Sequence, residues 1–205
     1  MSKKHRGNLF IVSAPSGAGK TSLCQKLTAV LPNIRHSVSF TTREPRKGEV
    51  NDRDYTFLSE GEFMRMVDAG EFAEWARVHG NLYGTSKKRL EELRDEGINV
   101  ILDIDTQGAK SIRKTYNDGV FIFILPPSTA ALRERLEKRM SNPPEEIALR
   151  LKRASEEIED YKLYDYVIVN SDFAEALMEL KAIVIAEERR MQRIDPIWVQ
   201  NTFRS

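Results

Sequence analysis

Hydrophobic residues of this chain gather in short runs, and the segments between the runs repeat their apolar positions at helical spacing. The runs are rich in Val, Ile or Phe and are bounded by turn residues, which is typical of strands buried on both faces. They occupy residues 9–12, 98–102, 120–125 and 166–169, and residues 37–41 add a fifth expected strand. Helices are predicted over residues 20–31, 86–96, 106–116, 130–139 and 173–190. This alternation predicts an α/β fold in which helices flank a five-stranded parallel sheet.

Two stretches interrupt the alternation. Residues 42–84 are strand-like and rich in turns, and Ser59 with Glu62 has the spacing of a capping box that begins one short helix. We interpret residues 38–85 as an inserted mixed α+β subdomain. Residues 128–162 are helical and strongly charged, and Pro143 and Pro144 divide them into two helices that would form a mobile lid. The core then consists of residues 1–37, 86–127 and 163–205.

Composition limits the classes of protein that this chain can represent. At about 150 residues per domain, 205 residues predict a single domain, and 40% hydrophobic with 31% charged residues is a globular balance. Lys and Arg number 32 and Asp and Glu 31, so the formal net charge is only +1. A dedicated nucleic-acid-binding protein usually carries a clear basic excess. We therefore expect no nucleic-acid partner, although a local basic pocket remains compatible with this charge.

Cysteine, histidine and hydropathy patterns point to a cytoplasmic protein. The single cysteine, Cys24, excludes an internal disulfide and fits a reducing compartment. The histidines His5, His36 and His79 are scattered and form no zinc-site spacing. No apolar run reaches the roughly 18 residues of a membrane helix, and the run at 9–12 is too short for a signal peptide. We expect no membrane association.

The strongest chemical signal lies between the first strand and the first helix. It consists of Ala14, Pro15, Ser16, Gly17, Ala18, Gly19, Lys20 and Thr21. In a phosphate-binding loop, Gly17 and Gly19 turn backbone N–H groups towards phosphate oxygens, and the following helix adds the positive end of its dipole. Lys20 would reach the β- and γ-phosphates, and the Thr21 hydroxyl would bind Mg²⁺. The alternative is an ordinary glycine-rich turn, which the Gly-Lys-Thr triplet in this context disfavours.

One position departs from the usual phosphate-loop pattern, because Ala14 stands where the first glycine is expected. Alanine is harmless there provided that the backbone is not left-handed. A phosphate loop of this kind predicts a nucleoside triphosphate but does not identify the acceptor.

The inserted subdomain carries residues suited to a phosphorylated acceptor. Arg43 and Arg46 lie three apart, and Tyr55 and Tyr83 follow them in the sequence. Arginines with tyrosine hydroxyls can clamp a phosphate monoester through charge-assisted bonds, although a solvated charged turn is an equally good reading of the composition.

Glu74 and Thr85 suggest how a base would be recognised. A buried carboxylate beside a hydroxyl can accept from a base with adjacent N–H donors, such as guanine. Taken alone, Glu74 is more often an exposed strand residue.

With these residues in place, the chain closely resembles the guanylate kinase family from residue 9 to about residue 190. The resemblance is carried by SAPSGAGKT at 13–21, TTREPR at 41–46, GNLYGT at 80–85, ILDIDTQG at 101–108 and ILPPS at 124–128. It implies a P-loop kinase fold in which residues 38–85 bind GMP and residues 128–162 form the lid. The implied reaction transfers the γ-phosphoryl group of ATP to GMP, and to dGMP, giving ADP and GDP with Mg²⁺ as cofactor. Its implied role is purine nucleotide recycling and GTP supply.

The resemblance also implies individual roles. Residues that hold the GMP phosphate or line its site are Ser39, Arg43, Arg46, Tyr55 and Tyr83. Residues that read the guanine are Glu74, Thr85 and Asp105. Asp103 ends a predicted strand, where ligands of open parallel sheets lie, and would orient Mg²⁺ through water; either aspartate can instead cap a helix. Ser22 completes the ATP-binding loop, and Asn170 matches a position beside the adenine, although asparagine is also a routine turn residue.

Three arginines of the predicted lid complete the implied catalytic set with Lys20 and Arg43. Arg135 and Arg139 lie four apart on one helix face, and Arg150 follows on the next helix. A solvated helix with Glu–Arg pairs is the alternative, but these positions match family arginines that close over the triphosphate. Met140 follows Arg139 where the family usually has glycine, so a stiffer hinge is expected.

The C-terminal segment, residues 194–205, is apolar at Ile197, Trp198, Val199 and Phe203. These side chains would pack either on a neighbouring subunit, giving a homo-oligomer, or back on their own domain.

Three rival functions remain to be weighed. A non-catalytic module of the same family typically has a degraded phosphate loop, whereas Gly19, Lys20 and Thr21 are intact. A kinase of this fold acting on another acceptor, such as a ribose bisphosphate, would not need the base-reading set. A nucleotide-hydrolysing switch would need switch elements, which we do not find.

Overall fold

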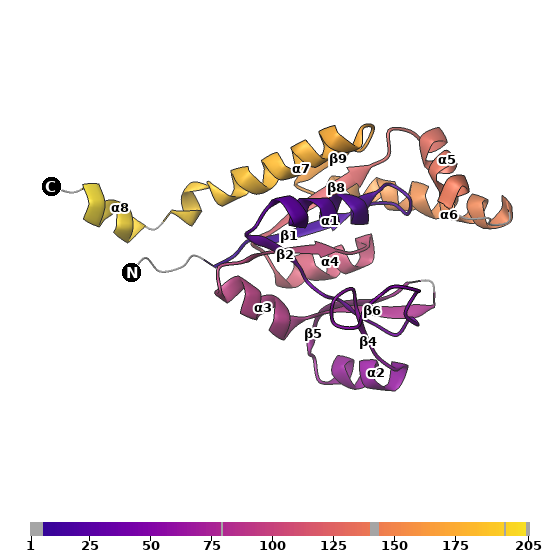
Figure 1. Ribbon diagram of the computed structural model, residues 1–205, viewed down its shortest axis with the longest axis horizontal. Coiled ribbons are helices and arrows are strands. Elements are labelled where there is room, and N and C mark those ends of the chain that lie inside the picture. The colour runs from indigo at the N-terminus through magenta and orange to yellow at the C-terminus, as the bar shows by residue number, and fades with distance from the viewer. Residues whose placement is uncertain (1–5, 79, 140–143, 195, 204–205) are drawn as a thin grey trace.

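The chain folds around two sheets, as the computed structural model shows for residues 6–78, 80–139, 144–194 and 196–203 (Figure 1). The larger sheet has five parallel strands in the order β2-β7-β1-β8-β9. These strands are β1 (Leu9–Ser13), β2 (Ile34–His36), β7 (Asn99–Asp103), β8 (Gly119–Leu125) and β9 (Tyr166–Val169). The predicted α/β fold with a five-stranded parallel sheet is therefore confirmed.

Helices cover both faces of this sheet because alternate strand residues point to opposite sides. On one face, α1 (Lys20–Val30) and α7 (Phe173–Glu188) pack on Phe10, Val12 and their neighbours. On the other, α3 (Lys87–Asp95) and α4 (Thr106–Thr115) pack on Leu9 and Ile11. Both faces of β1 are thus buried, which explains its uninterrupted apolar sequence.

The fifth strand was expected at the wrong place. Residues 37–41 do not join the parallel sheet; its edge strand is β2, in which Ile34 lies opposite Asn99 of β7. Residues 37–39 cross to the smaller sheet, where Phe40 and Thr41 form β3. The lone large apolar residue of the predicted run, Phe40, belongs to a different core, so its side chain could not anchor the parallel sheet.

The smaller sheet is mixed and has the order β4-β3-β6-β5. Its elements are β3 (Phe40–Thr41), β4 (Thr56–Phe57), β5 (Phe72–Val78) and β6 (Asn81–Ser86), with α2 (Glu60–Asp68) packed beside them. Phe40, Phe63, Phe72 and Leu82 form its own apolar core. The predicted capping box is present: the Ser59 hydroxyl accepts from the Glu62 N–H at 3.3 Å, and the Glu62 carboxylate accepts from the Ser59 N–H at 2.9 Å.

A helical layer follows β8. It comprises α5 (Thr129–Arg139), α6 (Pro144–Ile158) and the short 3₁₀ helix η1 (Glu159–Leu163). Leu132, Leu136, Ile147, Leu151 and Ala154 give it an apolar core of its own. Pro143 and Met140, singled out in the sequence, lie outside the described residues.

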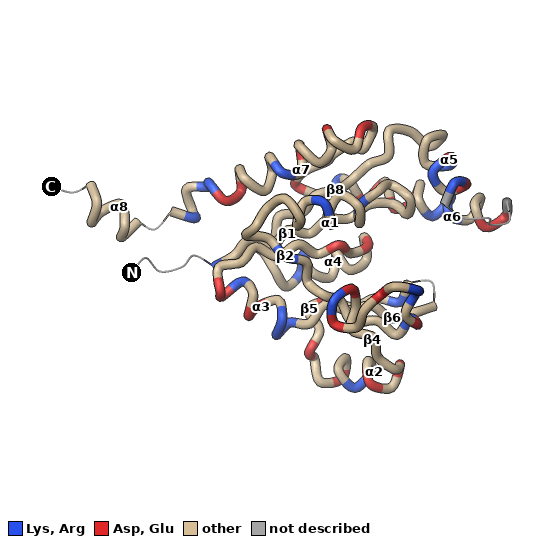
Figure 2. The backbone as a smooth tube through the Cα atoms, in the orientation of Figure 1, with Lys and Arg blue, Asp and Glu red and all other residues tan. Residues whose placement is uncertain are grey.

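The chain ends in the 3₁₀ turn η2 (Met191–Arg193) and the helix α8 (Pro196–Phe203), which extends away from the two sheets in Figure 1. The tube of α8 is tan in Figure 2 because Pro196–Phe203 contains no Lys, Arg, Asp or Glu, and Ile197, Trp198, Val199 and Phe203 are exposed. Packing of these side chains into the core of their own domain is therefore not observed. None of the described helices is long and apolar enough to cross a membrane.

Candidate active site

The phosphate loop joins β1 to α1 with the backbone that its glycines permit. Gly17 and Gly19 have φ angles of +95° and +96°, values that side-chain-bearing residues rarely adopt. Within the described residues, Asp52 is the one non-glycine with positive φ, so Ala14 is not left-handed. The condition under which alanine is harmless at this position is met.

Lys20 and Asp103 form an ion pair at the centre of the site. The Lys20 ammonium also donates to the Ile104 carbonyl at 2.8 Å. Because β7 is the neighbour of β1, its carboxyl end places Asp103 beside the start of α1. Burial opposes the charge of Lys20, but Asp103 outweighs it and raises the pKa of the ammonium. Burial likewise opposes the Asp103 charge, and Lys20 holds the pKa of that carboxyl below its ordinary value.

Thr21 and Asp103 offer oxygen atoms of the kind that Mg²⁺ prefers. Thr21 and Asp103 line the same cavity, and the Thr21 hydroxyl helps to lower the pKa of the Asp103 carboxyl, so the two metal-ligand candidates are neighbours. In the described part of the chain, no group of three or more His, Cys, Asp or Glu is placed to hold a metal. A protein-only cage is not required, since Mg²⁺ usually takes one or two protein oxygens and fills its octahedron with phosphate oxygens and water. The residues present fit that arrangement.

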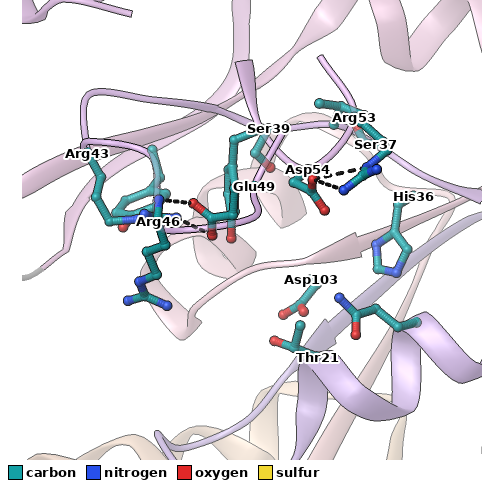
Figure 3. Close-up of a pocket in the computed structure, with 14 residues that line it drawn as sticks. Thr21, His36, Ser37, Ser39, Arg43, Arg46, Glu49, Arg53, Asp54 and Asp103 are labelled. Atoms are coloured by element: carbon teal, nitrogen blue, oxygen red, sulfur yellow. Dashed lines mark hydrogen bonds and ion pairs between the residues drawn. The ribbon is translucent and has the colours of Figure 1, made fainter. Parts of the chain in front are cut away.

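A cavity of about 410 Å³ lies between the smaller sheet and the phosphate loop (Figure 3). All five residues predicted for the acceptor phosphate line it: Ser39, Arg43, Arg46, Tyr55 and Tyr83. Arg43 is placed over the Tyr55 ring, with 5.3 Å between the guanidinium carbon and the ring centroid. Thr21 and Asp103 face the same cavity from the core. Both arginines line this pocket, Arg43 as a half-buried residue and Arg46 as an exposed one.

Glu49 is a structural member of this pocket that the sequence reasoning missed. Its carboxylate accepts from the Arg43 guanidinium at 2.9 Å and from the Arg46 backbone N–H at 2.7 Å. Both arginines are held in one turn by this single side chain. Glu49 follows Arg46 by three residues and Arg43 by six, and this spacing is the sequence signal that could have indicated its role. His36 also lines the pocket. No sequence signal pointed to it, because the fifth strand was expected at residues 37–41 and not at β2.

Glu74 lies at the base of a second cavity, of about 230 Å³, which Asp105 also lines. The Thr85 hydroxyl donates to Glu74 Oε1 at 2.7 Å. Glu74 is only 6% exposed, so the exposed-strand alternative is wrong. Burial raises the pKa of its carboxyl to about 7, and the charge of nearby Asp105 adds to the shift.

Asp105 has a second task. As the N-cap of α4, it accepts from the Gly108 N–H through Oδ1 at 2.8 Å. The capping alternative is thus confirmed for Asp105, whereas Asp103 pairs with Lys20.

Asn170 and Arg135 converge on the back of the phosphate loop. The Asn170 amide donates to the Ala18 carbonyl at 2.7 Å, and the Arg135 guanidinium donates to the Asn170 carbonyl at 2.8 Å and to that of Ala18 at 3.4 Å. Asn170 is 4% exposed, so its side chain is more than a routine turn residue. A side-chain carbon at Gly19 would lie 2.5 Å from the Asn170 amide nitrogen, which gives that glycine a second reason to be there.

Of the remaining lid arginines, Arg150 pairs within its own helix rather than at the phosphate loop. Arg150 donates to Glu146 on its own helix at 2.7 Å. The side chain of Arg139, the last residue of α5, lies outside what the structure describes. Ser16, Thr21 and Ser22 are exposed at the loop and the start of α1, where a triphosphate has access.

Comparisons with known proteins agree over nearly the whole chain. Residues 6–187 match the family model of guanylate kinase. The guanylate kinases of Geobacter metallireducens and Geobacter sulfurreducens are 54% and 53% identical over 191 residues, covering 93% of this chain and 94% of each relative. The crystal structure of guanylate kinase from Anaplasma phagocytophilum superposes with a TM-score of 0.80 at 37% identity, covering 98% of this chain and 96% of that one.

Proposed function

The chain belongs to the guanylate kinase family and phosphorylates GMP with ATP, and we propose that the γ-phosphoryl group passes from a triphosphate at the phosphate loop to a GMP that occupies the two cavities described above. The observation that carries this proposal is that the cavities share walls. Ser39, Tyr55, Tyr83, Thr21 and Asp103 line both the arginine cavity and the Glu74 cavity. A third cavity, of about 260 Å³, lies at the phosphate loop. Lys20 and Asp105 line both this cavity and the Glu74 cavity. Donor and acceptor phosphates would thus meet at Lys20, giving ADP and GDP.

On the donor side, the triphosphate of ATP lies in the loop of residues 14–22, against backbone N–H groups of that loop. Lys20 follows the β- and γ-phosphates as negative charge redistributes during transfer. Asn170 and Arg135 keep the loop in shape from behind, and the adenine lies near Asn170. Positioning and charge neutralisation supply most of the catalysis, because phosphoryl transfer asks for little covalent work from the protein.

On the acceptor side, Arg43 and Arg46 bind the phosphate of GMP, with Ser39, Tyr55 and Tyr83 completing the pocket. Glu74, Thr85 and Asp105 read the guanine, since carboxylate oxygens can accept from the ring N1–H and the 2-amino group. Nothing in these contacts involves the ribose 2′-hydroxyl, so we include dGMP among the acceptors.

Mg²⁺ bound with ATP would be held by Thr21 directly and by Asp103 through water. When present, it withdraws negative charge from the phosphate oxygens. Arg139 and Arg150 of the lid would close over the triphosphate, and Arg135, which in this structure donates to the Ala18 and Asn170 carbonyls, would join them on closure. Closure would exclude water that otherwise hydrolyses ATP. We place this activity in the cytoplasm, in purine nucleotide recycling and GTP supply.

The test is ADP formation from Mg-ATP with GMP, dGMP, AMP, UMP, CMP or no acceptor. We expect turnover with the two guanine nucleotides and at least about 10²-fold less with the others, the discrimination that unpaired buried polar groups impose. Turnover with a different acceptor would favour a kinase of another specificity. GMP binding without turnover would favour a non-catalytic module.

We also propose that the C-terminal segment, residues 194–205, joins two copies of the chain. Its support is the exposed, uncharged surface of Ile197, Trp198, Val199 and Phe203 on α8. Trp198→Glu should convert an oligomer to a monomer in sedimentation equilibrium without loss of helix content. A monomeric wild-type protein would contradict the proposal.

A further inference from the structure

Gly108 ends the ILDIDTQG segment and has no role in the function proposed so far. It is buried in the first turn of α4, three residues after the N-cap Asp105. Its φ angle is not among the positive ones, so the backbone does not require glycine. In such a position, alanine would stabilise the helix by about 1 kcal/mol. The absence of a side chain therefore needs another explanation.

The space beside Gly108 is taken by the carboxylate of Glu74. A side-chain carbon built on Gly108 would lie 2.8 Å from Glu74 Oε2 and 3.3 Å from Glu74 Cδ. Asp105 Oδ1 would be 3.4 Å away, an ordinary contact. The other carboxylate oxygen, Oε1, is fixed by the Thr85 hydroxyl. Oε1 of Glu74 is thus held by a hydrogen bond, and Oε2 occupies the space that a side chain at position 108 would need.

A bulge in β5 brings Glu74 to this place. Phe72 lies opposite Ser86, but Glu74 lies opposite Thr85, so one extra residue is accommodated between them. Bulges turn the following side chain and occur beside functional sites. Here Ala73 packs into the core cluster of the parallel sheet while Glu74 still reaches Thr85 and α4. The bulge orients the Glu74 carboxylate towards α4, and Gly108 leaves room for it there.

We propose that Gly108 is a specificity-determining residue, whose missing side chain sets the position at which the Glu74 carboxylate meets the guanine. This inference rests on the proposed role of Glu74 in reading the base. Because Glu74 is the flexible partner in the contact, an alanine at 108 displaces the carboxylate rather than the backbone. The protein then folds normally but presents its acceptor oxygens in the wrong place. Guanine offers two donors to the carboxylate, whereas hypoxanthine lacks the 2-amino group and offers one. Displacing the carboxylate should therefore weaken the binding of IMP less than the binding of GMP.

The experiment compares Gly108→Ala with Gly61→Ala. Gly61 is also in the first turn of a helix, α2, but a side-chain carbon there would meet nothing within 4 Å. For Gly108→Ala we expect the KM for GMP to rise about tenfold, equivalent to roughly 1.4 kcal/mol. The ratio of kcat/KM for GMP over IMP should fall, with the KM for ATP and the Tm unchanged or the Tm raised. Gly61→Ala should change none of the kinetic constants.

A Gly108→Ala enzyme with wild-type KM for GMP and a wild-type GMP-to-IMP ratio would overturn the inference. Glu74→Gln in the same assays separates this failure from that of the proposed function. If Glu74→Gln leaves the GMP-to-IMP ratio unchanged, the base-reading role itself is wrong. If Glu74→Gln lowers the ratio and Gly108→Ala does not, only the role of Gly108 fails. Calorimetric binding of GMP and IMP to the two variants repeats the comparison without turnover.

Discussion

Replacing Lys20 with alanine is expected to lower kcat by at least about 10³-fold, the loss typical of removing a charged clamp from a transferring phosphoryl group. The ammonium is the cation that the fold fixes at the meeting point of the cavities, held by Asp103 and the Ile104 carbonyl. The raised pKa of Lys20 keeps it protonated throughout the physiological range. Its charge is preorganised, so no other side chain can take over this position without rebuilding the loop.

Steady-state ADP release and single-turnover rates measure this loss. Lys26→Ala is the matched control, because Lys26 lies on the same helix but is exposed. Since Lys20→Ala leaves the half-buried Asp103 carboxylate without its partner, the Tm of each variant must be recorded to show that the assay contains folded protein. A folded Lys20→Ala enzyme with a rate near that of wild type would refute the assignment of the phosphate loop.

Replacing Glu74 with glutamine is expected to raise the KM for GMP about 10²-fold, because two hydrogen bonds to a charged acceptor are worth roughly 3 kcal/mol together. The NH₂ group of the glutamine amide would also face the N–H donors of the guanine, with which it cannot hydrogen-bond. The KM for ATP should change little, since Glu74 lies in the acceptor cavity. Equal effects on both substrates would argue that Glu74 supports the fold rather than the base. Glutamine removes a buried charge, so the free energy of unfolding at pH 8 should not fall.

The pH dependence of the same constant gives an independent check. The pKa of Glu74 in the free protein is raised to about 7, so the carboxyl is largely neutral below that pH and ionised above it. Only the ionised form accepts from both N–H groups of guanine. The KM for GMP should therefore fall as pH rises through 7 and then level off. The GMP phosphate titrates near pH 6 and contributes its own dependence. In Glu74→Gln, the KM for GMP should keep the pH dependence that comes from the phosphate and lose the dependence centred near pH 7.

Strands of this fold could be predicted from the sequence only where the strand is long enough to show an apolar pattern. The strands β1, β7 and β8 were predictable because each is a largely apolar run between helices, and their burial on both faces produces that run. The edge strand β9 was predictable from its apolar sequence alone, since Val167 and Val169 are exposed. β2 was not, because it is an edge strand of three residues with Ile34 as its one buried side chain. The small sheet could be recognised only as an irregular insertion, since β3 and β4 have two residues each and no periodicity to detect.

The candidate site divides in the same way. The phosphate loop is a local motif, so its residues could be assigned from eight consecutive positions. The acceptor pocket depends on residues far apart in the sequence, such as Asp103 and Tyr55, whose proximity exists only after folding. Family resemblance supplied those residues, but it could not show that Glu49 holds both arginines or that Asn170 holds the Ala18 carbonyl. Such contacts follow from side-chain placement, which periodicity does not encode.

The strand order has a consequence for how the protein emerges from the ribosome. β1, which presents the phosphate loop, has both of its partners far downstream, with Leu9 opposite Val100 and Gly119. The small sheet, by contrast, pairs only residues between 40 and 86. Because long-range pairing must wait for the later strand, a nascent chain completes the acceptor-binding half first and carries an unpaired β1, apolar from Leu9 to Val12, until β7 and β8 have been made. The segment that binds the donor is thus made before the acceptor-binding half but is among the last to be held in place, which makes translation of residues 99–125 the interval in which this chain most needs protection from aggregation.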